Sequence, residues 1–194
     1  IPTISSAKSV DLIRDAKKKG LQVTCSVAAH HLVLTDDDLH NFDSTFKTNP
    51  PLRTNEDIKA LQIGGPLGGL VPVSKIDDLT IDFESFSKEG FLLGHASVVC
   101  VPSDFPIMKF IEHLFDFASY ESCGKCFPCR LGTKRGQELS EKALTSDYKI
   151  DRTLFADLLT TLEQGSLCAH GGGIPLPVRN AMQYFDDELK QYFN

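Results

Sequence analysis

The sequence predicts an α+β fold in which a mixed N-terminal segment and a short β-rich segment precede a helical bundle. Three observations support this prediction. Within the first sixty residues, an amphipathic helix pattern is followed by an apolar strand pattern. Short apolar runs then alternate with Gly/Pro turns up to about residue 103. Helical periodicity dominates the remaining residues. The expected boundaries of the three parts are residues 1–61, 62–103 and 104–194.

The N-terminal part begins with a predicted helix over residues 7–19, where "AKSVDLIRDAKKK" places apolar residues on one face. Ser5 or Ser6 can cap its start, and a glycine ends it. The run "LQVTCSVAA" then predicts a buried strand over residues 21–29, in which Cys25 acts as a small buried hydrophobe. This helix and strand, followed by a loop and the break "NPPLR", indicate a piece of α/β structure.

The middle part has the pattern of short strands separated by turns. Its clearest strand patterns are "LTIDF" at residues 79–83 and "SVVCV" at residues 97–101, where Cys100 is a second small buried hydrophobe. The stretch "GGPLGG" lacks both the GxGxxG spacing of a dinucleotide-binding loop and the GK of a phosphate-binding loop. We therefore expect it to form a turn between strands rather than a nucleotide site.

Four predicted helices make up the C-terminal part. The first, "FPIMKFIEHLFDFASY", has Ser103 or Asp104 as its cap and Pro106 in its first turn, and "TKRGQELSEKAL" is a weaker second helix. The third starts at Asp151 and ends at Gly165, and the fourth runs through "PLPVRNAMQYFDDELKQYF". The expected core face of the third helix consists of Leu154, Phe155, Leu158, Leu159 and Leu162. Four such helices joined by short loops predict a small bundle.

Composition excludes several classes of function. The net charge of -6 and the pI near 5.5 argue against a nucleic-acid binder and against a protein that binds anionic membranes, since both need clustered cations. No apolar run approaches the roughly 18 residues of a membrane span, so we expect no direct membrane insertion. The first residues lack the pattern of a secretory leader. Together with the irregular spread of the six cysteines, this favours a reducing, cytoplasmic location.

Three cysteines share one short segment, "ESCGKCFPCR", in which Cys123, Cys126 and Cys129 follow a CxxCxxC spacing. Each two-residue gap lets the backbone curl and aim successive sulfurs at a common point, as a 4Fe-4S cluster requires of its ligands. Cys168 lies in "GSLCAHGGG", directly after a predicted helix end, so a returning loop can deliver it as the fourth ligand. The spacing therefore favours an iron–sulfur site.

The neighbours of these cysteines suit an anionic cluster. Gly124 offers a backbone N–H at close approach, Lys125 and Arg130 bring positive charge, and Pro128 stiffens the loop. Donors and cations near the sulfurs are expected to raise the reduction potential.

Two other chemistries also use cysteines. Structural zinc prefers two separated CxxC or Cys/His pairs, whereas the first three thiols here crowd one loop, so the spacing favours the cluster but leaves zinc as an alternative. Thioredoxin-like redox chemistry by one CxxC pair needs a βαβ setting that is absent from this part of the sequence.

The motifs "GGPLGGLVP", "DFESFSKEGFLLGHASVVCVP", "ESCGKCFPCRLGTKRG" and "LEQGSLCAHGGGIPLPVRNAMQYFDDEL" occur in this order over residues 59–194. This stretch resembles the C-terminal part of the NADH- and FMN-binding diaphorase subunit of respiratory complex I, NAD-reducing hydrogenases and NAD-dependent formate dehydrogenases. The resemblance implies a ubiquitin-like SLBB remnant followed by a helical domain that binds one 4Fe-4S cluster. It also implies that the cluster relays electrons from FMN to iron–sulfur centres in partner subunits. Carried over by motif, the cluster ligands are Cys123, Cys126, Cys129 and Cys168.

The chain departs from that family in three respects. The family's flavin and NADH site lies upstream, in an α/β domain with a glycine-rich loop, and has no counterpart here, so FMN and NAD belong to the intact family subunit. We expect that this chain does not oxidise NADH alone. About half of the SLBB domain is missing, and His170 stands where relatives usually carry leucine.

Residues 1–61 resemble a segment of dihydroorotase, a TIM-barrel amidohydrolase. A barrel of eight strands needs about 250 residues, so this segment predicts only a barrel fragment. Thr3 stands where that family places a histidine, and the HxH pair of the first barrel strand is absent. His30 and His31, near Asp36 to Asp38, would point to opposite faces of a strand, which favours structural roles over a shared metal ion. The chain is thus interpreted as a composite joined near residues 56–62, and a non-catalytic, dihydroorotase-like amidohydrolase fragment is the alternative function.

Overall fold

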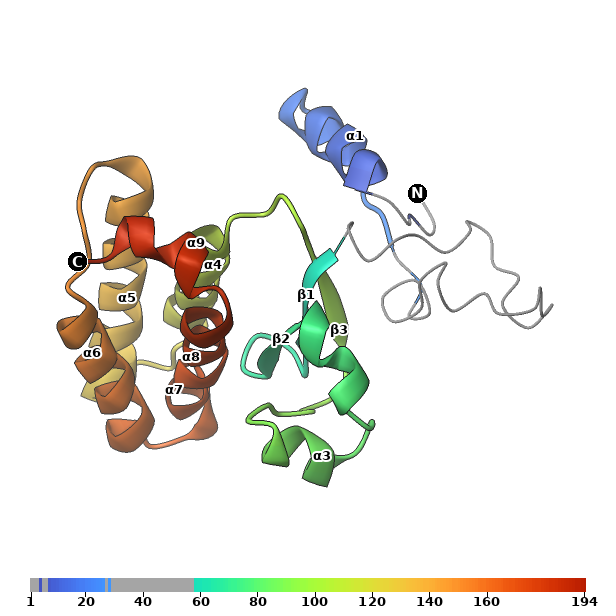
Figure 1. Cartoon of the computed structure of the whole chain (residues 1–194). Coiled ribbons are helices and arrows are strands. Elements are labelled where there is room, and N and C mark those ends of the chain that lie inside the picture. The colour runs from blue at the N-terminus through green and yellow to red at the C-terminus, as the bar shows by residue number, and fades with distance from the viewer. Residues whose placement is uncertain (1–3, 5–6, 27, 29–57) are drawn as a thin grey trace.

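The computed structural model describes residues 4, 7–26, 28 and 58–194. A small antiparallel sheet stands beside a helical bundle, and the N-terminal helix α1 (Ala7–Lys18) lies past one end of that sheet (Figure 1). The mixed helical and strand content confirms the predicted α+β class. The predictions made for His30, His31 and Asp36 to Asp38, and for the join near residues 56–62, lie wholly or largely outside the described residues.

The sheet consists of β1 (Ile58–Ile63), β2 (Gly69–Pro72) and β3 (Val98–Pro102), in the order β2-β1-β3. Both neighbours run antiparallel to the central strand β1. The tight connection from β1 to β2 contains two glycines with positive φ, Gly64 at 88° and Gly65 at 83°, a backbone region that strongly favours glycine. The predictions of a turn at "GGPLGG" and of a strand at "SVVCV" are confirmed.

The strand predicted over residues 79–83 is wrong. A 3-10 turn, η5 (Val73–Asp78), precedes it, and the helix α3 (Phe83–Lys88) begins within it. Asp82 caps that helix, because its carboxylate accepts a hydrogen bond from the backbone N–H of Ser85 at 2.6 Å. This local cap competes with a strand that has no neighbour to pair with.

The bundle contains α4 (Ile107–Tyr120), α5 (Phe127–Thr145), α6 (Arg152–Gly165), α7 (Ala169–Gly173), α8 (Pro175–Tyr184), α9 (Asp186–Leu189) and the 3-10 turn η6 (Lys190–Tyr192). Two boundary predictions hold, because Asp151 caps α6 through the N–H of Leu154 and Gly165 ends it. Two are wrong. Pro106, not Ser103 or Asp104, precedes α4, and the long fourth helix is broken at Phe185.

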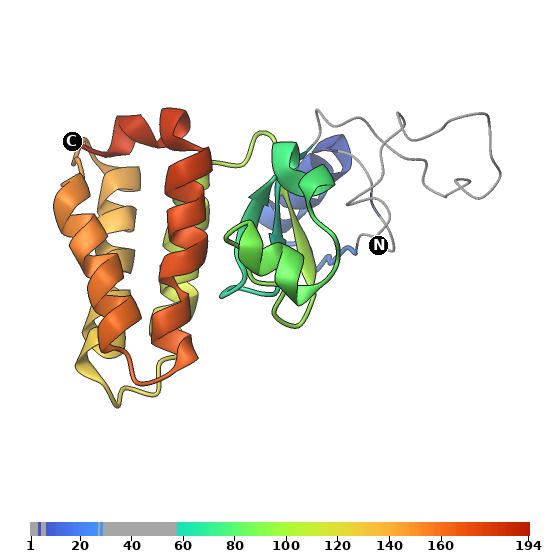
Figure 2. The same ribbon diagram turned by 60° about the horizontal axis from the view of Figure 1, so that its bottom comes forward.

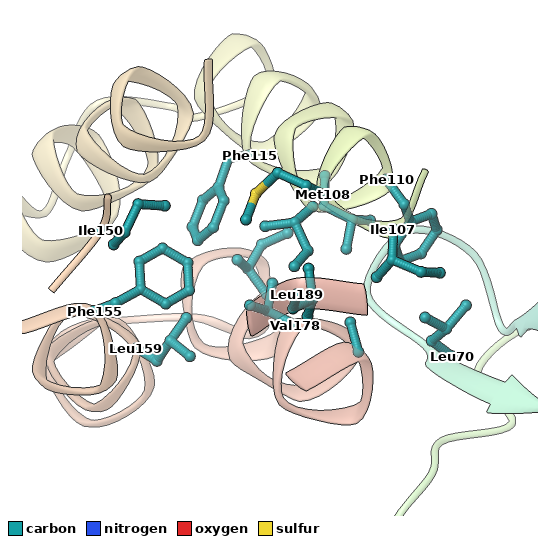
Figure 3. Packing of buried hydrophobic residues seen from close by; sticks show 14 of the residues in the cluster. Leu70, Ile107, Met108, Phe110, Phe115, Ile150, Phe155, Leu159, Val178 and Leu189 are labelled. Atoms are coloured by element: carbon teal, nitrogen blue, oxygen red, sulfur yellow. The ribbon is translucent and has the colours of Figure 1, made fainter. Parts of the chain in front are cut away.

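The bundle core is continuous between α4, α6 and α8 (Figure 3). Phe155 lies at its centre, with edge-to-face ring contacts to Phe115 at 6.0 Å and to Phe193 at 5.4 Å between centroids. Three of the predicted core residues of α6, Phe155, Leu159 and Leu162, are buried, and Leu158 is partly buried. Leu154 is 66% exposed, so its assignment to the core is wrong. It lies next to the fully buried Phe155 but to one side of the helix face that Phe155, Leu159 and Leu162 present to the core.

Helix α5 packs closely because its buried face consists of small residues, namely Cys129, Gly132, Thr133, Gly136, Ser140 and Ala143. A Cβ atom at Gly136 would lie within 3.0 Å of the Phe115 ring on α4, a separation that real Cβ atoms essentially never show. A Cβ at Gly132 would lie 3.0 Å from the side chain of Leu162 on α6. The two glycines thus let α5 approach both neighbours.

Polar contacts fix the sheet against the bundle. Asn180 of α8 accepts a hydrogen bond from the N–H of Leu70 at 3.3 Å and donates one to the carbonyl of Gly90 at 3.2 Å. Glu188 of α9 pairs with Lys59 of β1 at 2.6 Å and also accepts the N–H of Ile107 at 2.7 Å. That second bond satisfies a free donor at the start of α4, where Pro106 has no capping side chain.

The predicted N-terminal helix is confirmed, but residues 21–26 of the predicted strand form no strand, and Cys25 is exposed. A strand is stable only when a neighbour pairs with its backbone, and no described strand pairs with this segment. Helix α1 contacts the rest of the chain through Arg14, which pairs with Asp104 at 3.2 Å and stacks on Phe105. Within the described part of the chain, no helix is long and apolar enough to cross a bilayer.

We predict that Gly136→Ala destabilises the fold by about 1–3 kcal/mol, because the added methyl group overpacks the contact with Phe115. Urea unfolding followed by circular dichroism measures this change. Ser140→Ala on the same buried face is the control, since it removes a buried hydroxyl that has no hydrogen-bond partner among the described residues and improves helix propensity. A Gly136→Ala variant as stable as the unchanged chain would contradict the close packing of α5.

Candidate functional site

The cysteine segments lie at one end of the bundle. Figure 2 shows the connection between α4 and α5 beside the connection between α6 and α7. Cys126 is the residue directly before α5, and Cys168 is the residue directly before α7. Cys123 lies on the first connection, and Cys129 lies within the first turn of α5. The fold thus brings the later cysteine back to the segment that carries the first three.

Three contacts join the two connections directly. The backbone of Leu167, the residue before Cys168, lies close enough to the Cys126 sulfur to favour its thiolate. A Cβ atom at Gly171 would lie 2.7 Å from the Cβ of Cys129, and one at Gly165 would lie 2.8 Å from the Pro128 ring. The glycines therefore let the α6–α7 connection lie against the three-cysteine segment without a steric clash.

The thiols influence one another electrostatically. Burial raises the pKa of the Cys129 thiol, and the charges of Cys126, Cys168 and Cys123 raise it further. The backbone of Leu167 lowers the pKa of the Cys126 thiol, and the backbone of Cys129 adds to that effect. All four predicted ligands are thus close enough for Cys129 to be affected by the other three.

Ser122 connects the backbone to a sulfur, a contact that the sequence analysis missed. The N–H of Gly124 donates to Ser122 Oγ at 3.3 Å, and the same Oγ lies 3.4 Å from Cys129 Sγ. A thiolate can only accept a hydrogen bond, so the Ser122 hydroxyl donates to Cys129 once that thiol is deprotonated. The N–H of Gly124, expected to face a cluster, acts on the sulfur through this hydroxyl. A serine directly before a ligand cysteine is the signal that could have suggested it.

The charged residues at the site are held differently from one another. The Arg130 guanidinium lies 4.7 Å above the Phe127 ring and donates to the carbonyl of Gly124 at 3.2 Å. Gly124 has a φ of 74°, which favours glycine at this bend. Lys125 is exposed on the same connection.

His170 fastens the later segment to α4. Its Nε2 donates to the backbone carbonyl of Ala118 at 2.9 Å, and its ring lies 6.2 Å from that of Phe117. Ala118 lies in the last turn of α4, from which the chain enters the segment with the first three cysteines. The histidine therefore ties the two halves of the site together and does not lie free in solvent.

Access to the sulfurs is uneven. Cys129 is buried, Cys126 is partly buried, and Cys123 and Cys168 are exposed. Among the described residues, no three His, Cys, Asp or Glu side chains are arranged to hold a single metal ion. Cys100 lies on β3 in the sheet, half-buried, where burial raises the pKa of its thiol to about 12. Its placement on a strand is as predicted, and neither it nor the exposed Cys25 belongs to the site.

A family model, described as the NADH-ubiquinone oxidoreductase-F iron-sulfur binding region, matches residues 109–192. These residues are similar to that family region. The matched range contains α5, α6, α7 and all four cysteines of the site. The resemblance to the diaphorase subunit is therefore confirmed for this part of the chain, and the cofactor of this family region is a 4Fe-4S cluster.

Similar proteins include subunits of hydrogenases. The NADP-reducing hydrogenase subunit HndC of Solidesulfovibrio fructosivorans is 30% identical over 135 residues, which are 69% of this chain and 27% of that protein. A crystal structure of an NAD+-reducing NiFe hydrogenase in the H2-reduced state matches with a TM-score of 0.63 and 25% identity, over 73% of this chain and 24% of that chain.

The chain is also similar to dihydroorotases. The enzyme of Anoxybacillus flavithermus is 41% identical over 111 residues, which are 56% of this chain and 26% of that protein. The chain spans about a quarter of the length of each of these two curated relatives.

The residues present fit an iron–sulfur cluster. Four thiols are the usual ligand set of a 4Fe-4S cluster. The partly lowered pKa of Cys126 favours the thiolate, which is the form that binds iron. The two connections that carry the thiols are in contact through Leu167 and Gly171.

We predict that Ser122→Ala raises the pKa of the Cys129 thiol in the metal-free chain, because the thiolate loses a donor while the burial of the sulfur persists. Labelling with iodoacetamide over a range of pH, read by peptide mass spectrometry, follows each cysteine separately. The labelling curve of Cys129 is expected to move to higher pH. The exposed Cys25 serves as an internal control, and identical Cys129 curves in both chains would show that the hydroxyl does not act on this sulfur.

Proposed function

We infer that the C-terminal part of this chain is an electron-relay module that carries one 4Fe-4S cluster on Cys123, Cys126, Cys129 and Cys168. The observation that carries this proposal is the close approach of α7, which follows Cys168, to the start of α5, where a Cβ atom at Gly171 would lie 2.7 Å from the Cβ of Cys129. The family match over residues 109–192 supports it independently. When bound, such a cluster supplies the capacity to accept and release one electron at a time.

The protein's own residues hold and tune the ligands. Cys126 directly precedes α5, and Cys129 lies in its first turn. The backbone N–H groups at this end of a helix favour negative charge nearby. Ser122 supplies a hydroxyl donor to one sulfur. Arg130, held by the carbonyl of Gly124, and Lys125 add positive charge near the thiolates. Donors and cations of this kind stabilise the reduced, more negative state and raise its potential.

The packing of the module keeps the ligands in place. The Pro128 ring lies against Gly165, at the end of α6, so the first turn of α5 and the α6–α7 connection move together. The bond from His170 to Ala118 restrains the other side of the site. Rigid support of this kind limits the rearrangement that accompanies each change of charge.

The wider pathway is part of the proposal. In the intact family subunit, the electrons would come from NADH through FMN and would leave for iron–sulfur centres of partner subunits in a dehydrogenase or hydrogenase complex. A cytoplasmic location fits this role, because thiolate ligands survive in a reducing compartment.

The similarity to dihydroorotases favours a second candidate, an amidohydrolase that opens the dihydroorotate ring at a divalent metal ion. The sequence opposes it, because Thr3 replaces the expected histidine and the HxH pair is absent. We therefore expect no metal-dependent ring opening by the purified chain, followed as the change in ultraviolet absorbance of dihydroorotate. Turnover above that of a metal-free control would establish this activity.

We predict that Cys168→Ser leaves a three-thiolate site and lowers the bound iron and sulfide several-fold after anaerobic purification. Iron and sulfide assays, with EPR after dithionite reduction, measure the loss. Cys100→Ser is the matched control, since Cys100 lies in the sheet and should keep the full cluster. Full iron content in Cys168→Ser would refute the assigned fourth ligand, and one zinc without sulfide in the unchanged chain would favour the structural zinc alternative.

A further inference from the structure

One exposed face of α5 combines apolar and basic side chains beside the cysteine site. It runs over the first nine residues of the helix and is called here the α5 stripe. Its members lie three or four residues apart and are all exposed, whereas the small residues between them are buried. The stripe consists of Phe127, Arg130, Leu131, Lys134 and Arg135.

Large apolar side chains at this site point to solvent next to the cysteines. Phe127 is 67% exposed and follows Cys126, Leu131 is 57% exposed in the same helix turn, and Leu167 is 74% exposed directly before Cys168. Leu167 lies on the neighbouring α6–α7 connection, whose backbone lies close to the Cys126 sulfur. Burying such a side chain contributes about 1.5–3 kcal/mol, so a group of exposed ones indicates a surface that another molecule covers.

The charge of this surface is opposite to that of the chain. Residues 120–136 contain Lys125, Arg130, Lys134 and Arg135 but one carboxylate, Glu121, in a chain with a net charge of -6. Three of the cations lie in the N-terminal half of α5, whose first turn has no acidic residue. Cations at that end oppose the helix dipole and cost about 0.3–1 kcal/mol each at low salt. Helix stability therefore does not account for them.

Contacts within the chain do not account for all of these cations either. Arg130 is engaged with Gly124, and Arg135 lies 3.4 Å from Glu138 on the helix surface. Lys134 bonds only the neutral amide oxygen of Gln137, at 2.7 Å, among the described residues. Lys134 is eight residues beyond Cys126, about 12 Å along the helix axis. Because its partner among the described residues is a neutral amide, its charge is presented mainly to solvent.

We propose that the α5 stripe is the docking surface of an acidic protein that takes a single electron from the cluster. This proposal rests on the proposed function. The cluster is oxidised by one electron, and a flavin or iron–sulfur centre of the partner is reduced by it, with no bond made or broken. An aromatic and an aliphatic anchor beside arginine and lysine match the anatomy of a protein interface, with an apolar centre and a charged rim. Cys123 and Cys168 are exposed. The two connections that carry them lie at one end of the bundle (Figure 2), where a docked partner comes close to the ligands.

Rapid mixing of the dithionite-reduced, cluster-loaded chain with two oxidised probes tests this proposal. Flavodoxin is an acidic one-electron carrier, and cytochrome c is a basic one. We expect the second-order rate with flavodoxin to fall as salt is raised, and the rate with cytochrome c to show no such fall, because opposite charges steer encounter at low ionic strength.

Charge reversal supplies the decisive comparison. Lys134→Glu combined with Arg135→Glu should lower the flavodoxin rate about tenfold at low salt, remove its salt dependence and speed the reaction with cytochrome c. Lys17→Glu combined with Lys18→Glu makes the same change in net charge on α1, which lies away from the end of the bundle with the α4–α5 and α6–α7 connections, and should leave the flavodoxin rate within about twofold (Figure 1).

A second pair of variants, one test and one control, examines the apolar part of the α5 stripe. Leu131→Ser should lower the flavodoxin rate several-fold and keep its salt dependence, because it removes an anchor and no charge. Leu154→Ser, at the other end of the bundle and 66% exposed, should change nothing. All variants are compared at equal iron content.

The outcomes separate the two claims. An unchanged chain that binds no iron or sulfide refutes the proposed function, and with it the docking surface. A loaded cluster whose flavodoxin rate is unaffected by the Lys134 and Arg135 reversals and by Leu131→Ser refutes the docking surface alone. Equal losses in the α1 control also refute it, because they would show that net charge, not the stripe, governs the rate.

Discussion

The close packing of α5 is the constraint on which the site depends. Its buried face carries Gly132 and Gly136, so its backbone approaches α4 and α6 more closely than a face of large side chains allows. Cys129 belongs to the same face, one turn before Gly132. The predicted sulfur ligand is thus positioned by the helix packing itself, and the Gly171 backbone then lies against this cysteine without steric conflict. One pattern of small residues fixes both the bundle and the place of the cysteine site.

That arrangement gives the four thiols unequal properties. Cys129 is buried and its thiol pKa is raised, whereas backbone donors lower the pKa of Cys126. Because metal ligands must be deprotonated, binding of iron releases protons from thiols of different acidity. The Ser122 hydroxyl offsets part of the burial cost at the most buried sulfur. Hydrogen-bond donors near the sulfurs thus partly offset the electrostatic cost of burying a thiolate in a closely packed site.

The sequence predicted the parts of this site that depend on short-range geometry. The CxxCxxC spacing, the capping of α6 by Asp151 and the turn at "GGPLGG" follow from local residue types, and the structure agrees on the cap and the turn. The strand predicted at residues 21–29 is wrong over its described residues 21–26, and the strand predicted at residues 79–83 is also wrong. A strand requires a partner strand, which sequence alone does not reveal. The contacts of Ser122, His170 and Leu167 join segments that fold together, and their residue types are equally common in ordinary loops. Leu154 has helical spacing, but spacing does not show how wide the buried face of the helix is, and only the face with Phe155, Leu159 and Leu162 is buried.

Net charge and local charge lead to different conclusions about partners. A chain with a net charge of -6 repels polyanions at long range, which is why composition argues against nucleic acid. At contact distance, within about 10 Å at moderate salt, a partner responds mainly to the charges that line the surface it meets. Around the cysteines those charges are mostly positive, and they lie among exposed apolar side chains. The acidic remainder of the chain then limits docking elsewhere, so a single basic stripe on an acidic protein is more selective than the same stripe on a neutral one.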